Sequence, residues 1–259
     1  MPKQYLKVVQ MSIKISIITS VWNNKETIKD AIDSVLAQTY ENIEYIVVDG
    51  ASSDGTVDIV KSYGDRISTF ISEKDKGIYD GLNKGVGLAT GDVIAFLHSD
   101  DLYNDPEAVA RVAEAFNATG ADAVYGDLIY TPKSDTSKVL RYWKSRDFHP
   151  KLLKQGWMPA HPTFFARREL YERYGAFDTT FRIAADYDFM LRVLSRGIKT
   201  HYLPNVLYKM RVGGESNKSI KNIIRKMKED YRALKNNRIG GISTIVIKNL
   251  SKIPQFFRK

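Results

Sequence analysis

Short apolar runs alternate with helix-type patterns through the first half of this 259-residue chain. Ile13–Thr19, Ile43–Asp49 and Val93–Leu97 are rich in β-branched residues and have the length of buried strands. Between the first two, Lys25–Gln38 repeats its apolar residues at helical spacing. Strands and helices that alternate in this way build βαβ units, in which helices cover a parallel sheet on both faces. The sequence therefore predicts an α/β fold with a mostly parallel central sheet flanked by helices.

The alternation becomes irregular after about residue 130. The second half predicts a mixed continuation of the same domain, with strands at Val139–Trp143, Thr163–Ala166, Thr200–Leu203 and Val206–Val212 and helices at Arg167–Tyr174 and Ala184–Ser195. The sequence contains no evident linker or internal repeat. We therefore expect one domain over residues 1–215, followed by a basic helical tail over residues 216–259.

The net charge of +9 is distributed unevenly along the chain. Residues 199–259 contain 15 Lys and Arg against 3 Asp and Glu, which gives a net charge of +12. Residues 1–198 contain 24 against 27, which gives a net charge of −3. The first three quarters of the chain are therefore not a uniformly basic nucleic-acid binder. We expect no nucleic acid among the partners.

The composition also excludes several kinds of site. The absence of cysteine excludes disulfides, Cys-ligated zinc and a thiol nucleophile. The four histidines form neither HxxxH nor HExxH, so a histidine-based metal site is not expected. No run of 18 apolar residues occurs, and Met1–Gln10 lacks the apolar core of a signal peptide. These features favour a cytoplasmic location.

Polar residues follow the predicted strands of the first half. They are Thr19, Asp49, Asp75 and the adjacent pair Asp100 and Asp101. In an open parallel sheet, ligands bind beyond the carboxyl ends of the strands. One such residue alone is also typical of an ordinary solvated loop, but their repetition at one edge of the sheet favours a ligand site. Asp49 could accept a hydrogen bond from a nucleobase N–H.

The pair Asp100 and Asp101 allows two interpretations. Adjacent carboxylates repel each other, and hard oxygen ligands of this kind suit Mg²⁺ or Mn²⁺, which often share their coordination shell with substrate phosphates. Alternatively, the pair caps the helix that Pro106 begins. The residue pattern alone weights the two equally.

Three further charged residues are candidates in the second half. Asp186 and Asp188 lie two apart at the start of a helix, so they point in different directions. One of them could face a cleft as a general base, although acidic residues are common at helix N-termini for electrostatic reasons alone. Arg211 precedes Gly213-Gly214, a combination that suits a loop closing on a diphosphate or a plain turn.

The motifs, taken in order, resemble glycosyltransferase family 2, whose inverting members have the nucleotide-sugar-binding GT-A fold. The resemblance runs from Ile15 to about Ser216 and is strongest with bacterial members that build lipopolysaccharide, capsule or exopolysaccharide. It rests on five stretches, namely Ile17–Ser20 with Trp22-Asn23, Val47–Thr56, Asp75–Asp80 with Asn83–Gly85, Phe96–Asp101, and Phe177-Asp178 followed by Asp186.

The resemblance implies a role for each matching residue. Thr19 and Asp49 would hold the base and ribose of a UDP-sugar, and Asp75 and Lys84 would line the nucleotide–sugar pocket. Asp100 and Asp101 occupy the metal-binding acidic motif, so Mg²⁺ or Mn²⁺ would bridge the diphosphate. Asp186 matches the catalytic base that deprotonates an acceptor hydroxyl, and Arg211 would close on the diphosphate.

This chain departs from the family pattern at two of these positions. The family often has Asp-Asp after the second strand, where this chain has Asp49-Gly50, and often has Asp or Asn where this chain has His98. The departures leave open which carboxylate contacts the base and what His98 does.

The tail predicts two basic amphipathic helices. Ile220–Leu234 and the segment after Gly241 each carry an apolar stripe beside Lys and Arg, and the chain ends in Phe256–Lys259. Such helices bind the surface of an anionic membrane, or else pack on the domain with a solvated basic face. A lipid-linked glycan acceptor favours contact with the cytoplasmic face of a bacterial inner membrane.

Two other functions compete with this interpretation. A nucleotidyltransferase also uses an α/β sheet and acidic metal ligands, but it would want a Gly-rich loop after the first strand, where this chain has Ser20–Lys25. A non-catalytic basic protein that binds membrane or nucleic acid would bind no UDP. The leading expectation is an inverting transfer of a sugar from a UDP-sugar to a glycan hydroxyl.

Overall fold

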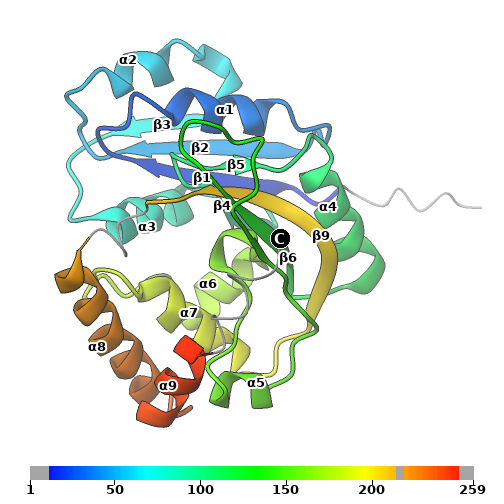
Figure 1. Cartoon of the computed structure of the whole chain (residues 1–259). Coiled ribbons are helices and arrows are strands. Elements are labelled where there is room, and N and C mark those ends of the chain that lie inside the picture. The colour runs from blue at the N-terminus through cyan, green and yellow to red at the C-terminus, as the bar shows by residue number, and fades with distance from the viewer. Residues whose placement is uncertain (1–11, 214–218, 251–259) are drawn as a thin grey trace, which may run out of the picture.

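A computed structural model describes residues 12–213 and 219–250 of the chain. A single nine-stranded sheet crosses the molecule, with helices on both of its faces (Figure 1). The strands are β1 (Ile15–Val21), β2 (Ile43–Asp49), β3 (Thr69–Ser72), β4 (Val93–Phe96), β5 (Leu102–Tyr103), β6 (Ala123–Thr131), β7 (Arg141–Trp143), β8 (Phe165–Arg167) and β9 (Thr200–Arg211). The predicted α/β architecture is confirmed.

The α-helices and two short 3₁₀ turns follow the same element order. The helices are α1 (Ile28–Leu36), α2 (Thr56–Lys61), α3 (Ile78–Leu88), α4 (Ala108–Thr119), α5 (Lys151–Lys154), α6 (Arg168–Tyr174), α7 (Ala185–Leu194), α8 (Ile220–Asn236) and α9 (Ile242–Leu250). The 3₁₀ turns are η1 (Gly64–Arg66) and η2 (His161–Thr163). The four-residue helix α5 was not predicted, because one helical turn shows no periodicity.

The first half of the sheet is parallel, and the second half is mixed, as the sequence predicted. The strand order is β3-β2-β1-β4-β8-β6-β9-β5, with β7 paired to β6. Strands β3, β2, β1 and β4 are mutually parallel, and β6 pairs in parallel with β9. Strand β8 is antiparallel to both of its neighbours, and the short strands β5 and β7 are antiparallel to β9 and β6. The carboxyl ends of β1 to β4 therefore meet at one edge.

One strand prediction is wrong in detail. Two strands were expected around Pro204, but β9 runs without a break from Thr200 to Arg211. The pairing with β6 shifts register where Tyr125 opposes Tyr202 and Asp127 opposes Val206. A proline cannot donate to the ladder, and a register shift of this kind accommodates the missing bond without ending the strand.

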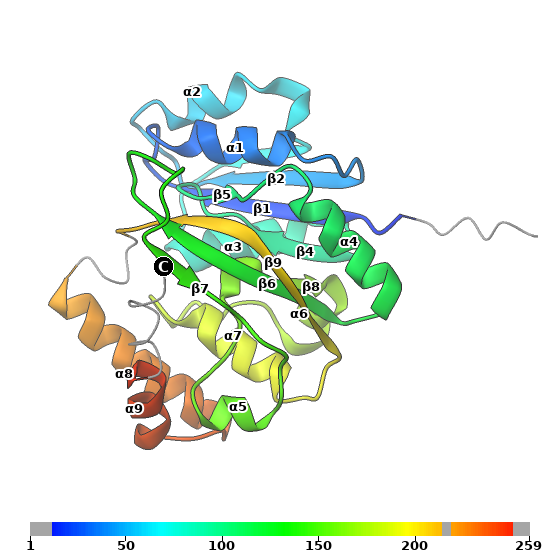
Figure 2. The same ribbon diagram turned by 45° about the vertical axis from the view of Figure 1, so that its right-hand side comes forward.

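Each face of the sheet has its own apolar core. Alternate residues of β1 point to opposite faces, so Ile15 and Ile17 pack with α1, α2 and α4, whereas Ile18 packs with α3, α6 and α7. Figure 2 shows the same two layers from a second direction, with α1 and α2 above the sheet and α7 below it. Helices α8 and α9 join the second core through Ala233, Leu234 and Ile245.

The predicted basic helices of the tail are present as α8 and α9, and both lie against the rest of the chain. Lys248 of α9 is buried and pairs with Asp230 of α8 at 2.9 Å, while its ammonium lies 3.2 Å from the ring centroid of Tyr187 in α7. The expected closing loop at Gly214–Ser216 and the terminal aromatics Phe256 and Phe257 lie outside the described residues. None of the described helices is long and apolar enough to cross a membrane.

Candidate active site

The loops that follow β1, β2 and β4 are joined by hydrogen bonds at the carboxyl edge of the sheet. The backbone N–H of Asn23 donates to Ser52 Oγ at 2.7 Å, and Asn23 Oδ1 accepts from the N–H of Ser53 at 2.8 Å. Asn24 Nδ2 donates to Ser99 Oγ at 2.9 Å. Asn23 and Ala51 both have positive φ, at 45° and 61°, which is uncommon for residues with a side chain. The predicted site residues on these loops therefore share one edge.

Thr19 and Asp49 lie fully buried at this edge. The Thr19 hydroxyl lies 3.1 Å from the Tyr45 hydroxyl, so its side chain faces the core under α1. Asp49 Oδ2 accepts from the N–H of Ser52 at 2.9 Å and from Ser72 Oγ at 2.7 Å. Asp49 Oδ1 is buried and has no hydrogen-bond partner among the described residues. Asp49 therefore has one acceptor oxygen without a partner among the described residues, whereas the Thr19 hydroxyl is hydrogen-bonded to Tyr45.

Asp75 explains the glycine that departs from the family pattern. A Cβ placed on Gly50 would lie 2.6 Å from Asp75 Oδ2 and 3.4 Å from Cδ1 of the exposed Trp22. A Cβ on Gly81 would lie 3.3 Å from the same Asp75 oxygen. Asp75 Oδ1 accepts from the N–H of Gly77 at 2.9 Å. The Asp75 carboxylate thus occupies the space that a second aspartate after β2 would fill.

Lys84 lies on α3 below this loop. Its ammonium pairs with Glu73 at 2.9 Å and donates to the carbonyl oxygen of Lys74 at 3.0 Å. The hydrogen bond to Glu73 raises the pKa of Lys84. Lys84 is therefore a cation that fixes the β3–α3 loop, and the negative charge of Asp75 acts on its ammonium group.

Asp100 and Asp101 differ sharply in their surroundings. Asp101 is 1% exposed, and its Oδ1 accepts from the N–H of Arg211 at 2.8 Å. Its Oδ2 is buried with no hydrogen-bond partner among the described residues. Burial, and then the charge of Asp100, raise the pKa of Asp101 well above its usual value. The alternative interpretation, a helix cap, does not hold for the pair, because Asp105 instead accepts the N–H of Glu107 before α4.

A metal ion fits this arrangement. The free Asp101 oxygen and the nearby Asp100 carboxylate form a hard donor set that a divalent cation would stabilise. The described residues contain no group of three or more acidic or histidine side chains that could hold a metal alone. Asp100 and Asp101 would therefore share a cation with oxygens from a ligand.

Arg211 lies at the end of β9, beneath these two aspartates. Its side chain is 4% exposed, and its guanidinium donates to the carbonyl oxygen of Asp100 at 2.8 Å and to Asp30 Oδ2 at 2.5 Å. The guanidinium is therefore enclosed by α1 and the acidic loop. The Gly-Gly that follows allowed a loop closing on a diphosphate or a plain turn, and in the structure burial and two partners fix the Arg211 side chain.

Asp186 is half-buried in the first turn of α7. Its Oδ1 lies 3.0 Å from the Tyr79 hydroxyl, which also lies 2.7 Å from the carbonyl oxygen of Ile183. Tyr79 comes from α3, so this contact joins segments that are 107 positions apart. Burial, and then the charge of Asp186, hold the pKa of Tyr79 well above its usual value. The phenol is therefore protonated, and its single hydrogen is shared between the Asp186 carboxylate and the Ile183 carbonyl oxygen.

Asp188 points away from Asp186, as the two-residue spacing on a helix predicts. It is buried, and it accepts from Asn237 Nδ2 at 2.9 Å and lies 3.6 Å from Arg192. Burial raises its pKa. Asp188 is therefore a buried carboxylate with side-chain partners, and it makes no capping bond at the start of α7.

His161 connects the acidic loop with α7. Its ring stacks on Phe96 at 5.4 Å and lies 6.5 Å from the ring of His98, whose carbonyl oxygen accepts from the N–H of Asp101 at 3.0 Å. Burial lowers the pKa of His161 to about 4, against the opposing charge of Asp186. A neutral histidine thus lies close to His98 of the acidic loop and within the electrostatic influence of Asp186.

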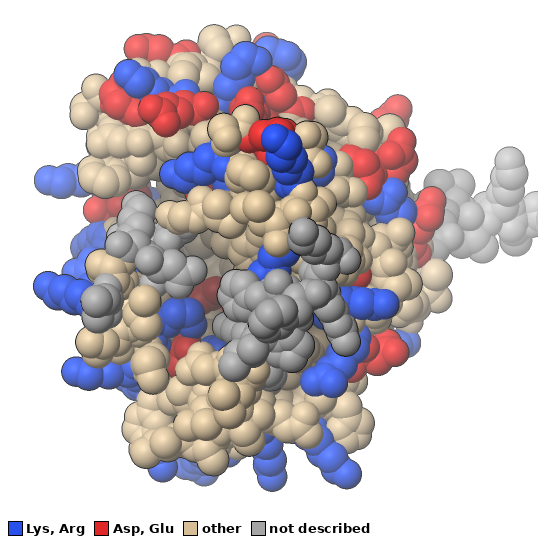
Figure 3. All heavy atoms as spheres, viewed as in Figure 1, with Lys and Arg blue, Asp and Glu red and all other residues tan. Residues whose placement is uncertain are grey.

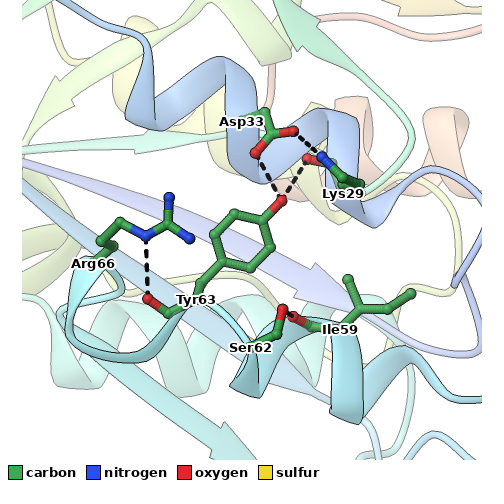
Figure 4. A pocket seen from close by; sticks show the side chains of 6 residues that line it. All are labelled: Lys29, Asp33, Ile59, Ser62, Tyr63 and Arg66. Atoms are coloured by element: carbon green, nitrogen blue, oxygen red, sulfur yellow. Dashed lines mark hydrogen bonds and ion pairs between the residues drawn. The ribbon is translucent and has the colours of Figure 1, made fainter.

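A separate surface pocket of about 430 Å³ lies away from this edge, between α1 and α2 (Figure 4). Lys29 donates to Asp33 at 2.6 Å, Asp33 accepts from the Tyr63 hydroxyl at 2.7 Å, and the Arg66 guanidinium lies over the Tyr63 ring. The polar groups that line this pocket satisfy one another. The site is therefore assigned to the strand edge and not to this pocket.

The family model for glycosyl transferase family 2 matches residues 16–175. This chain belongs to glycosyltransferase family 2. The match covers the loops after β1 to β4 and ends before Asp186. This glycosyltransferase is 32% identical over 208 residues to a PGL/p-HBAD biosynthesis glycosyltransferase of Mycobacterium bovis, with 78% of each chain covered. It is 31% identical over 264 residues to an uncharacterized glycosyltransferase of Rickettsia typhi, with 95% of this chain and 80% of the relative covered.

Solved structures share the GT-A-type fold of this glycosyltransferase. A mannosyltransferase from Pyrobaculum calidifontis, in complex with GDP-Man and Mn²⁺, aligns with a TM-score of 0.69 at 20% identity over 96% of this chain and 74% of its own. A fragment of Staphylococcus aureus TarS, in complex with UDP-GlcNAc, aligns with a TM-score of 0.66 at 17% identity over 87% of this chain and 65% of its own. This chain spans 40% of the longer TarS chain.

Family membership settles which class of function applies. The protein is a glycosyltransferase, so the expectations of a nucleotidyltransferase or of a non-catalytic binding protein are set aside. The sequence motifs pointed to Asp49, Asp75 and Asp101 near the strand ends and to Asp186 at the start of a helix. The contact of Tyr79 with Asp186 was missed, because nothing in the sequence marks the tyrosine of α3 as a residue that reaches α7.

Proposed function

We propose that this enzyme transfers a sugar with inversion from a UDP-sugar to a hydroxyl of a glycan acceptor. One observation carries the proposal: Asp101, which has a buried carboxylate oxygen without a partner among the described residues, lies on the loop whose His98 ring is 6.5 Å from the ring of His161, and the charge of the half-buried Asp186 acts on His161. Asp101 suits a cation that neutralises a diphosphate, and Asp186 suits a base beside the sugar. The loops between them come from the carboxyl ends of parallel strands.

The nucleotide would lie over the loops after β1 and β2. Asp49 Oδ1 has no partner among the described residues and would accept the base N–H of uracil. Thr19 would shape the floor of this pocket through its place at the end of β1, because its hydroxyl is bonded to Tyr45. Asp75 and Lys84 would line the side of the pocket toward the ribose and diphosphate, where Gly50 and Gly81 leave room for the Asp75 carboxylate.

Asp100 and Asp101 would hold Mg²⁺ or Mn²⁺ in this proposal. The cation, when bound, would stabilise the charge on the departing UDP. Arg211 would support this by holding the Asp100–Asp101 loop through its backbone N–H and its guanidinium. Its positive charge lies under the loop and favours the diphosphate electrostatically from there.

Asp186 would take the proton from the acceptor hydroxyl as that oxygen attacks the anomeric carbon. The acceptor oxygen attacks the face of the anomeric carbon opposite the diphosphate, the bond from that carbon to the diphosphate oxygen breaks with the electron pair going to UDP, and the configuration therefore inverts. A general base of this kind contributes roughly 10²–10⁴-fold to the rate. The Tyr79 hydroxyl orients the carboxylate through its bond to Oδ1 and leaves the other oxygen for the acceptor.

A comparison of two neighbouring aspartates tests this assignment. Asp186→Asn should lower transfer by at least roughly 10²-fold while UDP affinity stays unchanged. Asp188→Asn is the matched control, because Asp188 lies in the same helix turn and its Oδ1 only accepts from Asn237. A thermal-shift screen of nucleotide sugars with Mn²⁺ selects the donor. Near-normal transfer by Asp186→Asn would exclude Asp186 as the base.

The acceptor in this proposal is a lipid-linked glycan, and α8 and α9 would contact the anionic cytoplasmic surface of an inner membrane. Their large exposed apolar side chains are Ile223, Ile224, Met227, Tyr231, Ile242, Val246, Ile247 and Leu250. Figure 3 shows Lys and Arg projecting around an uncharged surface at the lower side of the molecule, where Figure 1 places these helices. Apolar side chains bordered by cations suit an anionic lipid surface.

A further inference from the structure

Helix α8 contacts the segment that leads into α7 and carries Asp186. The Arg232 guanidinium lies 3.6 Å from the centroid of the Phe181 ring and donates to Thr180 Oγ1 at 3.2 Å. At the end of the helix, Asn237 donates to Asp188. Helix α8 therefore packs along the first turns of α7, the helix that carries the proposed base.

Glu229 makes the most concentrated of these contacts. Its carboxylate accepts the backbone N–H groups of three consecutive residues, Arg182 at 3.1 Å, Ile183 at 2.8 Å and Ala184 at 3.0 Å. Carboxylate hydrogen bonds of this kind are about twice as strong as neutral ones. One side chain of α8 thus satisfies the backbone of the whole segment before α7.

Helix α7 has no cap of its own that could do this. Its N-cap residue is Ala184, which has no side-chain oxygen, and no side-chain capping bond is made there. A helix start that lacks a cap is free to fray unless another group satisfies its N–H donors. Asp186 lies two residues into this start, so its position depends on the segment that Glu229 holds.

Ile183 is fixed from two sides. Its N–H donates to Glu229 Oε2, and its carbonyl oxygen accepts from the Tyr79 hydroxyl at 2.7 Å. Tyr79 belongs to α3, which precedes the segment in the sequence, and Glu229 belongs to α8, which follows it. The peptide groups on either side of Ile183 cannot rotate without breaking one of these bonds.

We propose that Glu229 is a positioning residue for the transfer step, which sets the place of the Asp186 carboxylate through the backbone of residues 182–184. The inference rests on the proposed role of Asp186 as the base. Helix α8 then has two functions. Its inner side positions the proposed base, and its outer side carries the exposed apolar and basic residues. Glu229 itself touches neither donor nor acceptor.

A positioning role predicts a change in kcat without a change in donor binding. Among the described residues Glu229 forms no hydrogen bond with the loops after β1, β2, β3 and β4, and the segment that it holds reaches the β3–α3 loop through a long bond of 3.4 Å from Arg182 to the carbonyl oxygen of Lys76. Displacement of a catalytic group by about 1 Å can lower a rate by on the order of 10²-fold. We expect Glu229→Ala to lower kcat by roughly 10- to 100-fold, and Glu229→Gln to lower it less, because a Gln oxygen can replace Oε2.

The experiment uses the full chain with Mn²⁺ and UDP-glucose, UDP-galactose or UDP-N-acetylglucosamine, whichever releases the most UDP with water as the acceptor. Initial rates give kcat and the donor KM, and calorimetry gives the Kd of UDP. Hydrogen exchange followed by mass spectrometry reports the amides of residues 182–184. Glu114→Gln on α4 is the matched control, since Glu114 is an exposed carboxylate on a distant helix.

The expected result is a lower kcat, an unchanged donor KM and UDP Kd, and exchange at residues 182–184 that is faster by on the order of 10-fold. Normal kcat in both Glu229 variants, alongside an inactive Asp186→Asn, would overturn the positioning role alone. Full activity of Asp186→Asn would overturn the base assignment instead, together with the role given to Glu229. A parallel rise in donor KM would show that α8 acts on folding or donor binding, against the proposal.

Discussion

The phenol oxygen of Tyr79 lies 3.0 Å from Asp186 Oδ1, and the burial of Tyr79 keeps its hydroxyl protonated beside that carboxylate. The bond runs from α3, which follows the loop of Asp75, to α7, the helix that carries the proposed base. It therefore relates the two halves of the site directly. A hydrogen bond to a charged group contributes about 1.5–3 kcal/mol.

Removal of this hydroxyl should slow transfer. Tyr79→Phe is expected to lower kcat by roughly 10-fold or more, since about 1.4 kcal/mol corresponds to a factor of ten. Tyr171→Phe is the matched control, because Tyr171 packs in the same core and its buried hydroxyl has no hydrogen-bond partner within residues 12–213 and 219–250. Initial-rate kinetics of both variants check the prediction. Equal rates for the two would show that the Tyr79 hydroxyl has no part in catalysis.

Metal dependence should follow Asp101. Mn²⁺ is expected to tighten UDP binding to the wild-type chain, and Asp101→Asn should remove most of that gain, because the free Oδ2 is the oxygen left for a cation. Asp105→Asn should keep the gain, since Asp105 pairs with Arg111 at 2.7 Å instead. Calorimetric titration of UDP with and without Mn²⁺ measures both. A metal effect that survives in Asp101→Asn would move the cation to another ligand set.

The close approach at Gly50 should limit substitution there. Gly50→Ala places a methyl group 2.6 Å from Asp75 Oδ2, so the Asp75 carboxylate must move, and UDP affinity should fall. Gly87→Ala in α3 is the control, since a Cβ there has open space and stabilises a helix by up to about 1 kcal/mol. Equilibrium binding and thermal melts separate the two effects. Unchanged UDP affinity in Gly50→Ala would place Asp75 outside the pocket.

Glu44 should control acid stability without affecting the site. Lys14, Ser16 and Thr90 donate to its carboxylate at the amino edge of the sheet, and despite burial these bonds lower its pKa to about 2. A depressed pKa stabilises the fold above the unfolded-state value of 4.5, and the stabilisation disappears as the pH falls toward 2.

Glu44→Gln should therefore lower the free energy of unfolding by on the order of 2 kcal/mol at pH 7, and by much less near pH 2. Urea denaturation at several pH values measures this difference. UDP affinity should stay at the wild-type value, because Glu44 lies at the edge of the sheet opposite the nucleotide loops. A loss of stability that is the same at both pH values would contradict the ionic origin.

Membrane contact should depend on the apolar face of α8. The full chain is expected to sediment with phosphatidylglycerol vesicles and less with phosphatidylcholine vesicles, and added salt should weaken the binding. The double variant Ile223→Asp/Met227→Asp should lose this binding. Val139→Asp/Leu140→Asp replaces equally exposed residues of another loop and should retain it. Failure of the wild-type chain to sediment with anionic vesicles would exclude the proposal.

The first half of the fold was predictable because its strands and helices are local patterns. The strand β2 was predicted with its observed bounds, and β1 and β4 within two residues. The carboxylates at the strand ends followed from the general geometry of such sheets. Periodicity and strand-end position are both visible in a single sequence.

The remainder depends on contacts between distant segments. Asp186 and Asp188 are equivalent in the sequence, and only the packing of α8 separates the half-buried residue from the buried one. Arg211 was expected on a loop that closes on a diphosphate or at a plain turn, and its enclosure could not be predicted because Asp30 lies 181 positions earlier. The tail was predicted as two amphipathic helices, and its inner face could not be predicted because Glu229 meets its partners 45 to 47 positions away.

The segment that matches the family ends at residue 175, whereas Asp186 and Glu229 lie beyond it. The three N–H groups held by Glu229 thus lie beyond the segment that the family model matches. Two relatives can therefore both match the family model and still differ in how firmly the proposed base is held. Exchange of the last helices between two such relatives would then alter turnover as well as the surface on which the enzyme works.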